Sequence, residues 1–338
     1  MRCLHTGRVV LARRNDRCEM RNEDKFIWSL LLHIGYRMWG DDDSLKPMPD
    51  ALAFDCDVWK AATERMAEIG MNMAIVDVGE GIVLPSHPEL AVKGSKEPEW
   101  MRGEVERLKK MGIEAVPKLN FATCHDAWLG EVQHMVSTPE YYKTCADVIK
   151  DVAEMFGRPR LFHIGMDEES DMGIQARKDY IVKRQGSLFW HDVKFLESEV
   201  NKHGARAWMF ADESWFNRES FYANCPKSIL LSNLYYGRSF RIAEAKWHPP
   251  RMQAYADLDA AGFDQVPCAT NWYPDFLYAK KGIRANDVNF PLTVAHCRST
   301  IKPERLKGFM MTTWKRTVKD CREFILHAID LVGQSMLI

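Results

Sequence analysis

The 338-residue sequence predicts a single (β/α)8 barrel of the α/β class, and three observations lead to that prediction. One unit recurs along the chain: an amphipathic helix, a glycine that ends it, a short apolar segment and then polar residues. Eight apolar segments occur at the spacing that strand–helix units need. They are continuously apolar rather than alternating, as expected of parallel strands buried on both faces. A doubly wound nucleotide-binding sheet is disfavoured, because no Gly-x-Gly-x-x-Gly follows the first strand.

The predicted strands end in polar residues. In chain order they span residues 26–34, 71–78, 113–121, 160–164, 205–210, 229–235, 266–272 and 309–314. The helix predicted over residues 57–69 carries an apolar stripe and ends at Gly70. The helix predicted over residues 139–156 begins with Thr138 as N-cap and Pro139 in the first helical position. Further helices are predicted over residues 188–203 and 318–332.

The charge balance narrows the class of partner. Lys and Arg number 46 against 47 Asp and Glu, which gives a formal net charge of −1. Nucleic acids and acidic membrane surfaces usually bind proteins with a basic excess, so neither partner is predicted. Nine cysteines at irregular spacing indicate neither a disulfide framework nor a structural zinc site. No cofactor is predicted.

The first 25 residues differ in composition from the rest. They carry six arginines around a short apolar stretch, residues 9–12. That stretch is too short for a signal peptide, and no small-residue cleavage site follows it. We therefore interpret residues 1–25 as a poorly ordered basic leader and residues 26–338 as one catalytic barrel. The sequence leaves the cellular location and the oligomeric state open.

The strand ends carry carboxylates, amides and aromatic rings. In a (β/α)8 barrel, functional residues lie at the C-terminal ends of the strands. This mixture suits a carbohydrate, because sugar ring faces stack on aromatic side chains and hydroxyls need polar partners. The candidate site residues at these ends are Arg37, His125, Trp128, Asp167, Glu168, Glu213, Trp272, Tyr273, Asp275, Trp314 and Arg316.

Asp167 and Glu168 form the most distinctive strand end. Cleavage of a glycosidic bond needs a proton donor and a group that stabilises an oxocarbenium-like centre. A carboxyl kept protonated by its surroundings can donate that proton. An acidic strand end can instead cap the following helix, and this alternative applies to Asp77 and Asp212.

A metal site is a weaker alternative at the same place. His125 and Asp126 could join Asp167 and Glu168 as ligands, but the sequence shows no His-x-x-x-His or comparable spacing. No metal is therefore predicted. His163 lies inside the fourth strand and is interpreted as a hydrogen-bonded core residue.

Residues 162–168, Phe-His-Ile-Gly-Met-Asp-Glu, resemble the strand-4 signature of glycoside hydrolase family 20, the β-N-acetylhexosaminidases. That signature reads His-x-Gly-Gly-Asp-Glu. The resemblance implies a retaining, substrate-assisted hydrolase that acts on a β-linked N-acetylhexosamine. It implies that Glu168 is the general acid/base and that Asp167 orients the 2-acetamido group of the substrate, whose oxygen attacks the anomeric carbon.

Other strand ends agree with the family in their order along the chain. The resemblance implies that Tyr273 holds the acetamido oxygen. It also implies sugar-binding roles for Arg37, His125, Asp275 and Trp314. Several positions depart from the family pattern. Met166 replaces the second glycine, Arg316 replaces a hydroxyl-binding carboxylate, Ala211 stands where the family usually has a tryptophan before the strand-5 acid, and the family's Pro-Gly-His is absent before His125. The departure at Arg316 suggests a substrate with an anionic group such as sulfate or uronate.

Two other classes of function remain open at this point. One is a retaining glycosidase with an enzyme nucleophile, a role that Glu213 or Asp275 could fill. The other is a non-catalytic carbohydrate-binding barrel in which Met166 blocks the site.

Overall fold

The computed structural model describes residues 25–36, 51–169, 182–241, 249–272 and 285–338. The strands are β1 (Ile27–His33), β2 (Met73–Asp77), β3 (Glu114–Lys118), β4 (Leu161–His163), β5 (Arg206–Phe210), β6 (Leu230–Ser232), β7 (Cys268–Thr270) and β8 (Gly308–Thr312). The α-helices are α1 (Cys56–Ile69), α2 (Pro98–Lys110), α3 (Pro139–Met155), α5 (Gly186–Lys202), α6 (Glu213–Phe216), α7 (Arg218–Asn224), α8 (Pro249–Ala260), α10 (Asn289–Thr300) and α11 (Arg322–Ser335). Short 3-10 helices are η2 (Gly79–Gly81), η3 (Pro88–Leu90), η4 (Ala127–Met135) and η6 (Lys319–Cys321).

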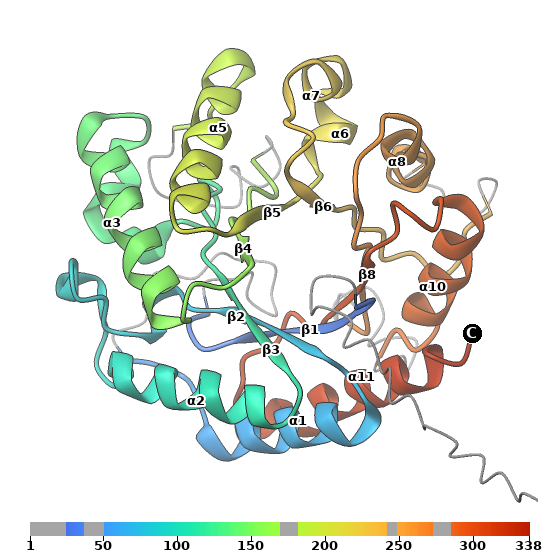
Figure 1. The fold of residues 1–338 in the computed structure, drawn as a ribbon, viewed down its shortest axis with the longest axis horizontal. Helices are drawn as coiled ribbons and strands as arrows, with labels where there is room; N and C mark the ends of the chain where they lie inside the picture. Colours follow the sequence, from blue (N-terminus) through green and yellow to red (C-terminus); the bar gives the residue numbers. More distant parts are fainter. Residues whose placement is uncertain (1–24, 37–50, 170–181, 242–248, 273–284) are drawn as a thin grey trace, which may run out of the picture.

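All eight strands belong to one parallel sheet, in the order β6-β5-β4-β3-β2-β1-β8-β7. Isolated parallel bridges join Leu231 to Gln265 and Leu234 to Cys268, between the β6 and β7 segments. The sheet is thus a nearly closed barrel, and Figure 1 shows the helices around it. The predicted (β/α)8 fold is confirmed.

Local chemistry sets the helix boundaries. Thr138 caps α3 as predicted, because its side chain accepts a hydrogen bond from the backbone N–H of Tyr141. Helix α1 begins one residue earlier than predicted, since the carboxylate of Asp55 accepts from two backbone N–H groups of the first turn. The last helix begins later than predicted, because Val318 is extended and η6 precedes α11.

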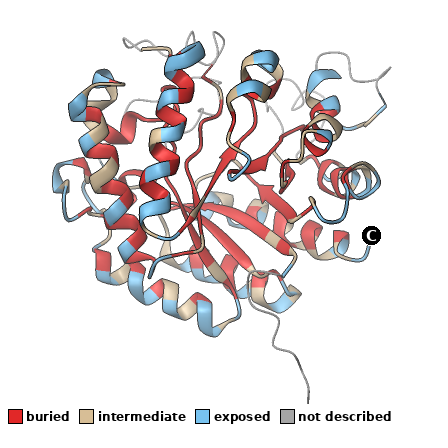
Figure 2. Ribbon diagram, turned by 45° about the horizontal axis from the view of Figure 1, so that its top comes forward, coloured by how far each residue is buried: buried red, intermediate tan, exposed pale blue. Residues whose placement is uncertain are grey.

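Two apolar layers hold the barrel together. One lies inside the barrel and includes Leu31, Ile75, Trp208 and Met310. The larger one lies between the strands and the helices, and Figure 2 shows the buried strands and inward helix faces that form it. Buried apolar area of this extent is the main driving force for folding.

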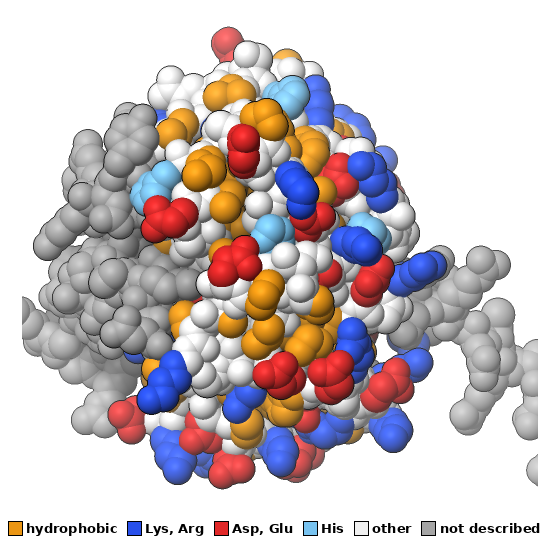
Figure 3. Space-filling view, turned by 90° about the vertical axis from the view of Figure 1, so that its left-hand side faces the viewer, with side chains coloured by type: hydrophobic (Ala, Val, Ile, Leu, Met, Phe, Trp, Pro, Cys, Tyr) orange, Lys and Arg blue, Asp and Glu red, His pale blue; other side chains and the backbone are white. Residues whose placement is uncertain are grey.

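The face of the molecule on the side of α2 and α3 is mixed in charge, with hydrophobic side chains among the charged ones (Figure 3). Figure 3, which faces the side of α2 and α3, shows acidic and basic side chains interspersed. Among the residues that the structure describes, no helix is long and apolar enough to cross a membrane. The seven cysteines in the described ranges are free thiols. Residues 1–24 lie outside the described residues, so the interpretation of a leader stays a prediction.

Candidate active site

The segment after β4 turns sharply, because its backbone adopts the left-handed region three times. The φ angle is +72° at Gly165, +68° at Met166 and +59° at Glu168. Each non-glycine residue in this region costs about 1–2 kcal/mol. Such strain persists only where surrounding contacts hold it, and it concentrates at functional sites.

Asn120, two residues past β3, holds this turn in place. Its Oδ1 accepts hydrogen bonds from the backbone N–H groups of Ala122 (3.1 Å) and Met166 (3.2 Å). Its Nδ2 donates to Oδ1 of Asp167 at 2.6 Å. A Cβ on Gly165 would lie 2.0 Å from Asn120 Oδ1 and 2.7 Å from its backbone Cα. Only glycine fits at that position.

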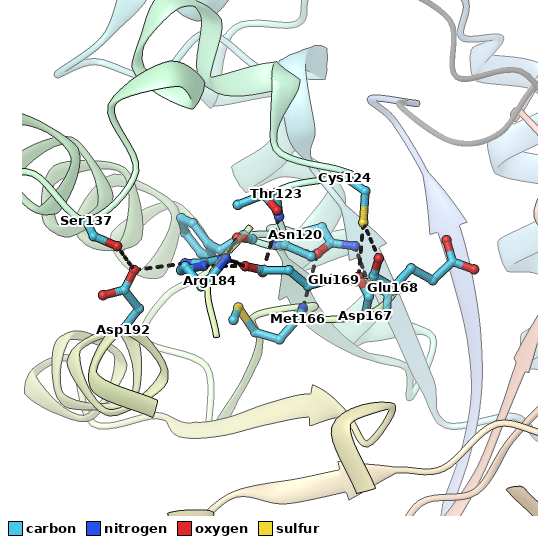
Figure 4. Close-up of polar contacts among 12 residues, drawn as sticks. Asn120, Thr123, Cys124, Ser137, Met166, Asp167, Glu168, Glu169, Arg184 and Asp192 are labelled. Atoms are coloured by element: carbon cyan, nitrogen blue, oxygen red, sulfur yellow. Dashed lines mark hydrogen bonds and ion pairs between the residues drawn. The ribbon is translucent and has the colours of Figure 1, made fainter. Parts of the chain in front are cut away.

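Met166 does not lie between the two carboxylates. Its side chain is buried in the apolar layer between strands and helices. Figure 4 shows it extending away from the carboxylate of Glu168. This placement removes the reason for expecting Met166 to block the site.

Glu168 and Asp167 both approach His125, which is buried in the loop after β3. Nε2 of His125 lies 3.0 Å from Oε2 of Glu168 and 3.8 Å from Oδ2 of Asp167. Although burial favours the neutral imidazole, the two carboxylates raise the pKa of His125. His125 and Glu168 can therefore share a proton.

The two neighbouring carboxylates differ in exposure. The side chain of Glu168 is 41% exposed, whereas that of Asp167 is only 6% exposed. The thiol of Cys124 donates to the backbone oxygens of Asp167 (3.5 Å) and Glu168 (2.9 Å), which fixes the chain between them. One carboxylate is thus open to a ligand and the other is buried and held.

A third carboxylate, Asp212, lies behind this pair. Its Oδ2 accepts from the backbone N–H of Glu168 at 3.3 Å, while its buried Oδ1 has no hydrogen-bond partner among the described residues. Burial, together with the charges of Asp167 and Glu168, raises the pKa of Asp212 well above its ordinary value. Asp212 precedes α6 but makes no capping hydrogen bond, so the capping alternative fails there.

We expect Asp212→Asn to increase the free energy of unfolding at pH 7 by about 1 kcal/mol or more. Because the folded state favours the protonated form of Asp212, its pKa is higher in the folded than in the unfolded protein. Its contribution to stability is complete below the unfolded pKa of about 4 and is lost as the pH rises through the folded pKa. An amide cannot ionise, yet its oxygen still accepts from Glu168. Urea unfolding at pH 7 and pH 4 measures the effect, with the exposed Asp320→Asn as control. A difference that did not shrink toward pH 4 would contradict the assignment.

A separate ion pair occupies the ends of β1, β2 and β3. Nζ of Lys118 lies 2.5 Å from Oδ2 of Asp77, and Nδ1 of His33 lies 3.3 Å from the same oxygen. Burial opposes ionisation of Asp77, but Lys118 and His33 lower its pKa below the ordinary range. Burial also lowers the pKa of His33. Asp77 therefore neutralises a buried lysine and caps no helix in this arrangement.

Trp314 forms an aromatic wall beside the barrel interior. Its ring centroid lies 6.1 Å from that of Phe210, 6.2 Å from that of His33 and 6.4 Å from that of Tyr236. The hydroxyl of Tyr36 donates to the backbone oxygen of Trp314 at 2.8 Å. The half-buried indole, at φ +48°, is a surface on which a sugar ring could stack.

Two further predicted ligands lie on neighbouring strand ends. The guanidinium of Arg316 lies 5.2 Å from the ring centroid of Tyr36, which places a cation next to the aromatic wall. Trp272 is half-buried after β7, and its backbone N–H donates to Thr270.

The structure places Trp128 and Glu213 less favourably as ligands. Trp128 is buried, packs on Phe121 and donates from Nε1 to the backbone oxygen of Asn120. It supports the site from the core and presents no open ring face to a sugar. Glu213 begins α6 and accepts from Nδ2 of Asn217 at 2.7 Å, and burial raises its pKa.

Three predicted ligands, Arg37, Tyr273 and Asp275, lie outside the described residues and stay predictions. Asn120 and Asp212 were not among the predicted ligands. The only sequence signal for either was a polar residue directly after an apolar strand, and that signal is shared by many residues that bind nothing.

One group of described residues could hold a metal ion. Ligand atoms of His125, Asp167 and Glu168 all lie within 4.8 Å of one another. The hydrogen bond between His125 and Glu168 accounts for much of this proximity. An imidazole nitrogen and two carboxylate oxygens in this arrangement also suit proton transfer without a metal ion.

Comparison with solved structures shows a consistent likeness in fold. A β-N-acetylhexosaminidase from Bacteroides fragilis superposes with a TM-score of 0.60 at 13% identity, over 91% of this chain and 65% of that one. Dispersin B superposes with a TM-score of 0.58 at 15% identity, over 92% of this chain and 99% of that one. A mutant Streptomyces plicatus β-hexosaminidase, solved with N-acetylglucosamine as product, superposes with a TM-score of 0.57 at 14% identity, over 92% of this chain and 64% of that one.

No family profile and no curated protein matches the sequence. At identities of 13–15% the structural likeness establishes the fold alone. The chain spans about two thirds of the length of the Bacteroides and Streptomyces proteins and nearly all of dispersin B. The barrel predicted from the repeated strand–helix units is thus a fold that these proteins share.

Proposed function

We propose that this protein is a retaining glycoside hydrolase that cleaves a β-linked N-acetylhexosamine with help from the substrate's own acetamido group. The observation that carries the proposal is the contrast between two adjacent carboxylates. Glu168 is open to a ligand and paired with His125, while Asp167 is buried and fixed by Asn120. The fold shared with the hexosaminidases supports the same conclusion.

In the proposed reaction, Glu168 gives its proton to the leaving glycosidic oxygen. The acetamido carbonyl oxygen attacks the anomeric carbon as the bond breaks, and an oxazolinium ion forms. Asp167 accepts a hydrogen bond from the acetamido N–H and stabilises the positive charge. Glu168, now ionised, takes a proton from water, which opens the oxazolinium ion with net retention. His125, whose pKa the neighbouring carboxylates raise against the effect of burial, lies within hydrogen-bond reach of Glu168 and can exchange a proton with it.

The identity of the nucleophile can be tested with matched substrates. We expect hydrolysis of 4-nitrophenyl N-acetyl-β-glucosaminide and negligible hydrolysis of 4-nitrophenyl β-glucoside. An N-trifluoroacetyl substrate should react more slowly, because fluorine withdraws electrons from the attacking oxygen. If the β-glucoside were cleaved as fast, an enzyme nucleophile such as Glu213 or Asp275 would be indicated instead. Binding of N-acetylglucosamine without turnover would indicate the non-catalytic alternative.

A second proposal concerns the natural substrate: it carries an anionic group near Trp314. The cation of Arg316 beside Tyr36 motivates it, since a charge-assisted hydrogen bond to a sulfate or carboxylate contributes about 1.5–3 kcal/mol. We expect kcat/KM to be about tenfold or more higher for the 6-sulfated aryl N-acetylglucosaminide than for the neutral one. Arg316→Gln should abolish the preference without lowering the neutral rate. Equal rates on both substrates with the wild type would contradict the proposal.

A further inference from the structure

Arg184 is a fully buried arginine bound to the residue that follows Glu168. Its Nε donates to Oε1 of Glu169 at 2.9 Å and its Nη2 donates to Oε2 at 2.7 Å, a bidentate pair. Its backbone N–H also donates to Oε1, at 2.8 Å. Both side chains have no exposed surface. A planar guanidinium matches a carboxylate in this way, whereas an ammonium group cannot.

The same guanidinium reaches two further parts of the barrel. Nη2 donates to the backbone oxygen of Phe121 at 2.6 Å, in the loop after β3. Nη1 donates to Oδ2 of Asp192 on α5 at 3.1 Å. Asp192 is itself held by the hydroxyls of Ser137 and Tyr142, at 2.7 and 2.5 Å. Figure 4 shows this network running from Asp192 and Ser137 to the turn that carries Glu168.

The network connects the two segments that carry the proposed proton-transfer pair. Glu169 follows Glu168, whose backbone is left-handed and requires outside contacts to hold it. Phe121 lies in the loop that carries His125, and the N–H of Thr123 in that loop also reaches Glu169, at 3.4 Å. One buried cation therefore braces both sides of the 3.0 Å contact between His125 and Glu168.

We propose that Arg184 is a positioning residue for this reaction: by clamping Glu169 to the loop after β3, it sets the distance between Glu168 and His125. The proposal rests on the proposed function for its kinetic consequence only. Burying a charge trio is costly and seldom improves stability over apolar packing. The geometry that the trio imposes is its proposed role here, since small misplacement of a catalytic group lowers turnover strongly.

Two variants separate positioning from stability. Arg184→Lys keeps the positive charge but loses the bidentate hydrogen bonding of the guanidinium to Glu169. The triple variant E169L/R184M/D192N replaces the whole buried trio with uncharged groups, so no buried charge is left without its partner and folding is usually preserved. Folding is verified by circular dichroism and the thermal midpoint. In folded protein we expect both to lower kcat on the aryl N-acetylglucosaminide by about 10- to 100-fold, with KM changed less than about threefold.

Arg107→Met is the matched control. Arg107 binds Glu104 at 2.7 Å and donates to Thr63, so its loss also removes the cation from a largely buried carboxylate, which keeps a hydrogen bond from Nε1 of Trp59. It lies on α2, and among the described residues it contacts Glu104, Met111 and Thr63, none of which belongs to the turn after β4. Its kcat should equal that of the wild type. A fall in kcat as large as that of Arg184→Lys would overturn the proposal, because it would show an effect of stability alone.

A measurement that needs no turnover tests the positioning role of Arg184 separately from the proposed hydrolase function. The ring of His125 is titrated by NMR, with its signal assigned from His125→Gln. Its pKa should fall in both Arg184 variants, since burial lowers it once the carboxylate of Glu168 moves away. Arg107→Met should leave it unchanged. An unchanged His125 titration in folded Arg184 variants overturns the positioning role, whereas an inactive wild type overturns only the proposed function.

Discussion

Replacing Glu168 by glutamine is expected to lower kcat/KM on 4-methylumbelliferyl N-acetyl-β-glucosaminide by about 10²- to 10⁴-fold. The amide keeps the shape of the side chain and can still bond with His125, but it cannot donate a proton to the leaving oxygen. The 41% exposure of the Glu168 side chain is what makes that donation feasible from this position. Glu154→Gln, at an exposed position on α3, is the control and should behave as the wild type.

The loss should depend on the leaving group. A 2,4-dinitrophenyl glycoside departs without protonation, so Glu168→Gln should lower kcat/KM for it far less. The ratio of the two losses measures the contribution of the acid, because kcat/KM reports steps up to the first irreversible one. An unchanged rate on both substrates, or an equal loss on both, would rule out Glu168 as the general acid.

Gly165→Ala is expected to destabilise the fold by about 2–5 kcal/mol. Two costs add at this position: about 1–2 kcal/mol for a left-handed non-glycine residue, and about 1–3 kcal/mol for the overpacking of a new methyl group. The clash involves the backbone Cα of Asn120 at 2.7 Å as well as its side chain, so it cannot be relieved by a rotamer change.

Gly112→Ala isolates the second cost. Gly112 has nearly the same conformation, φ +79°, but a Cβ there would meet nothing within 4 Å. Gly112→Ala should be destabilised only by the left-handed conformation of the new alanine. Urea unfolding of the two variants measures the difference between their free energies of unfolding, which is the cost of overpacking at Gly165. Equal destabilisation would mean that Asn120 yields easily and does not hold the turn. Residual Gly165→Ala protein should also lose activity, because Asn120 orients Asp167.

The strand ends show how much of the fold and of the candidate site local sequence patterns can predict. The apolar segments, the helix-ending glycines and the acidic end of β4 are local features, and the barrel and its candidate carboxylates follow from them. Trp128 shows the limit of the same reasoning. Its residue type and its place after β3 suggested a sugar platform, yet its ring is buried against Phe121.

The sequence by itself determined the class of fold and the order of the strands along the chain, and it predicted Asp167 and Glu168 as the centre of the candidate site. Only the tertiary structure decided which groups support them. Asn120 lies 47 residues from Asp167, and Arg184 lies 15 residues from Glu169. The tertiary structure also decided that the side chain of Met166 points into the core, although the neighbouring residues carry the proposed chemistry. The physical reason is that helix and strand periodicity depends on near neighbours, whereas hydrogen bonds, burial and side-chain direction depend on which distant segments the closed barrel brings together.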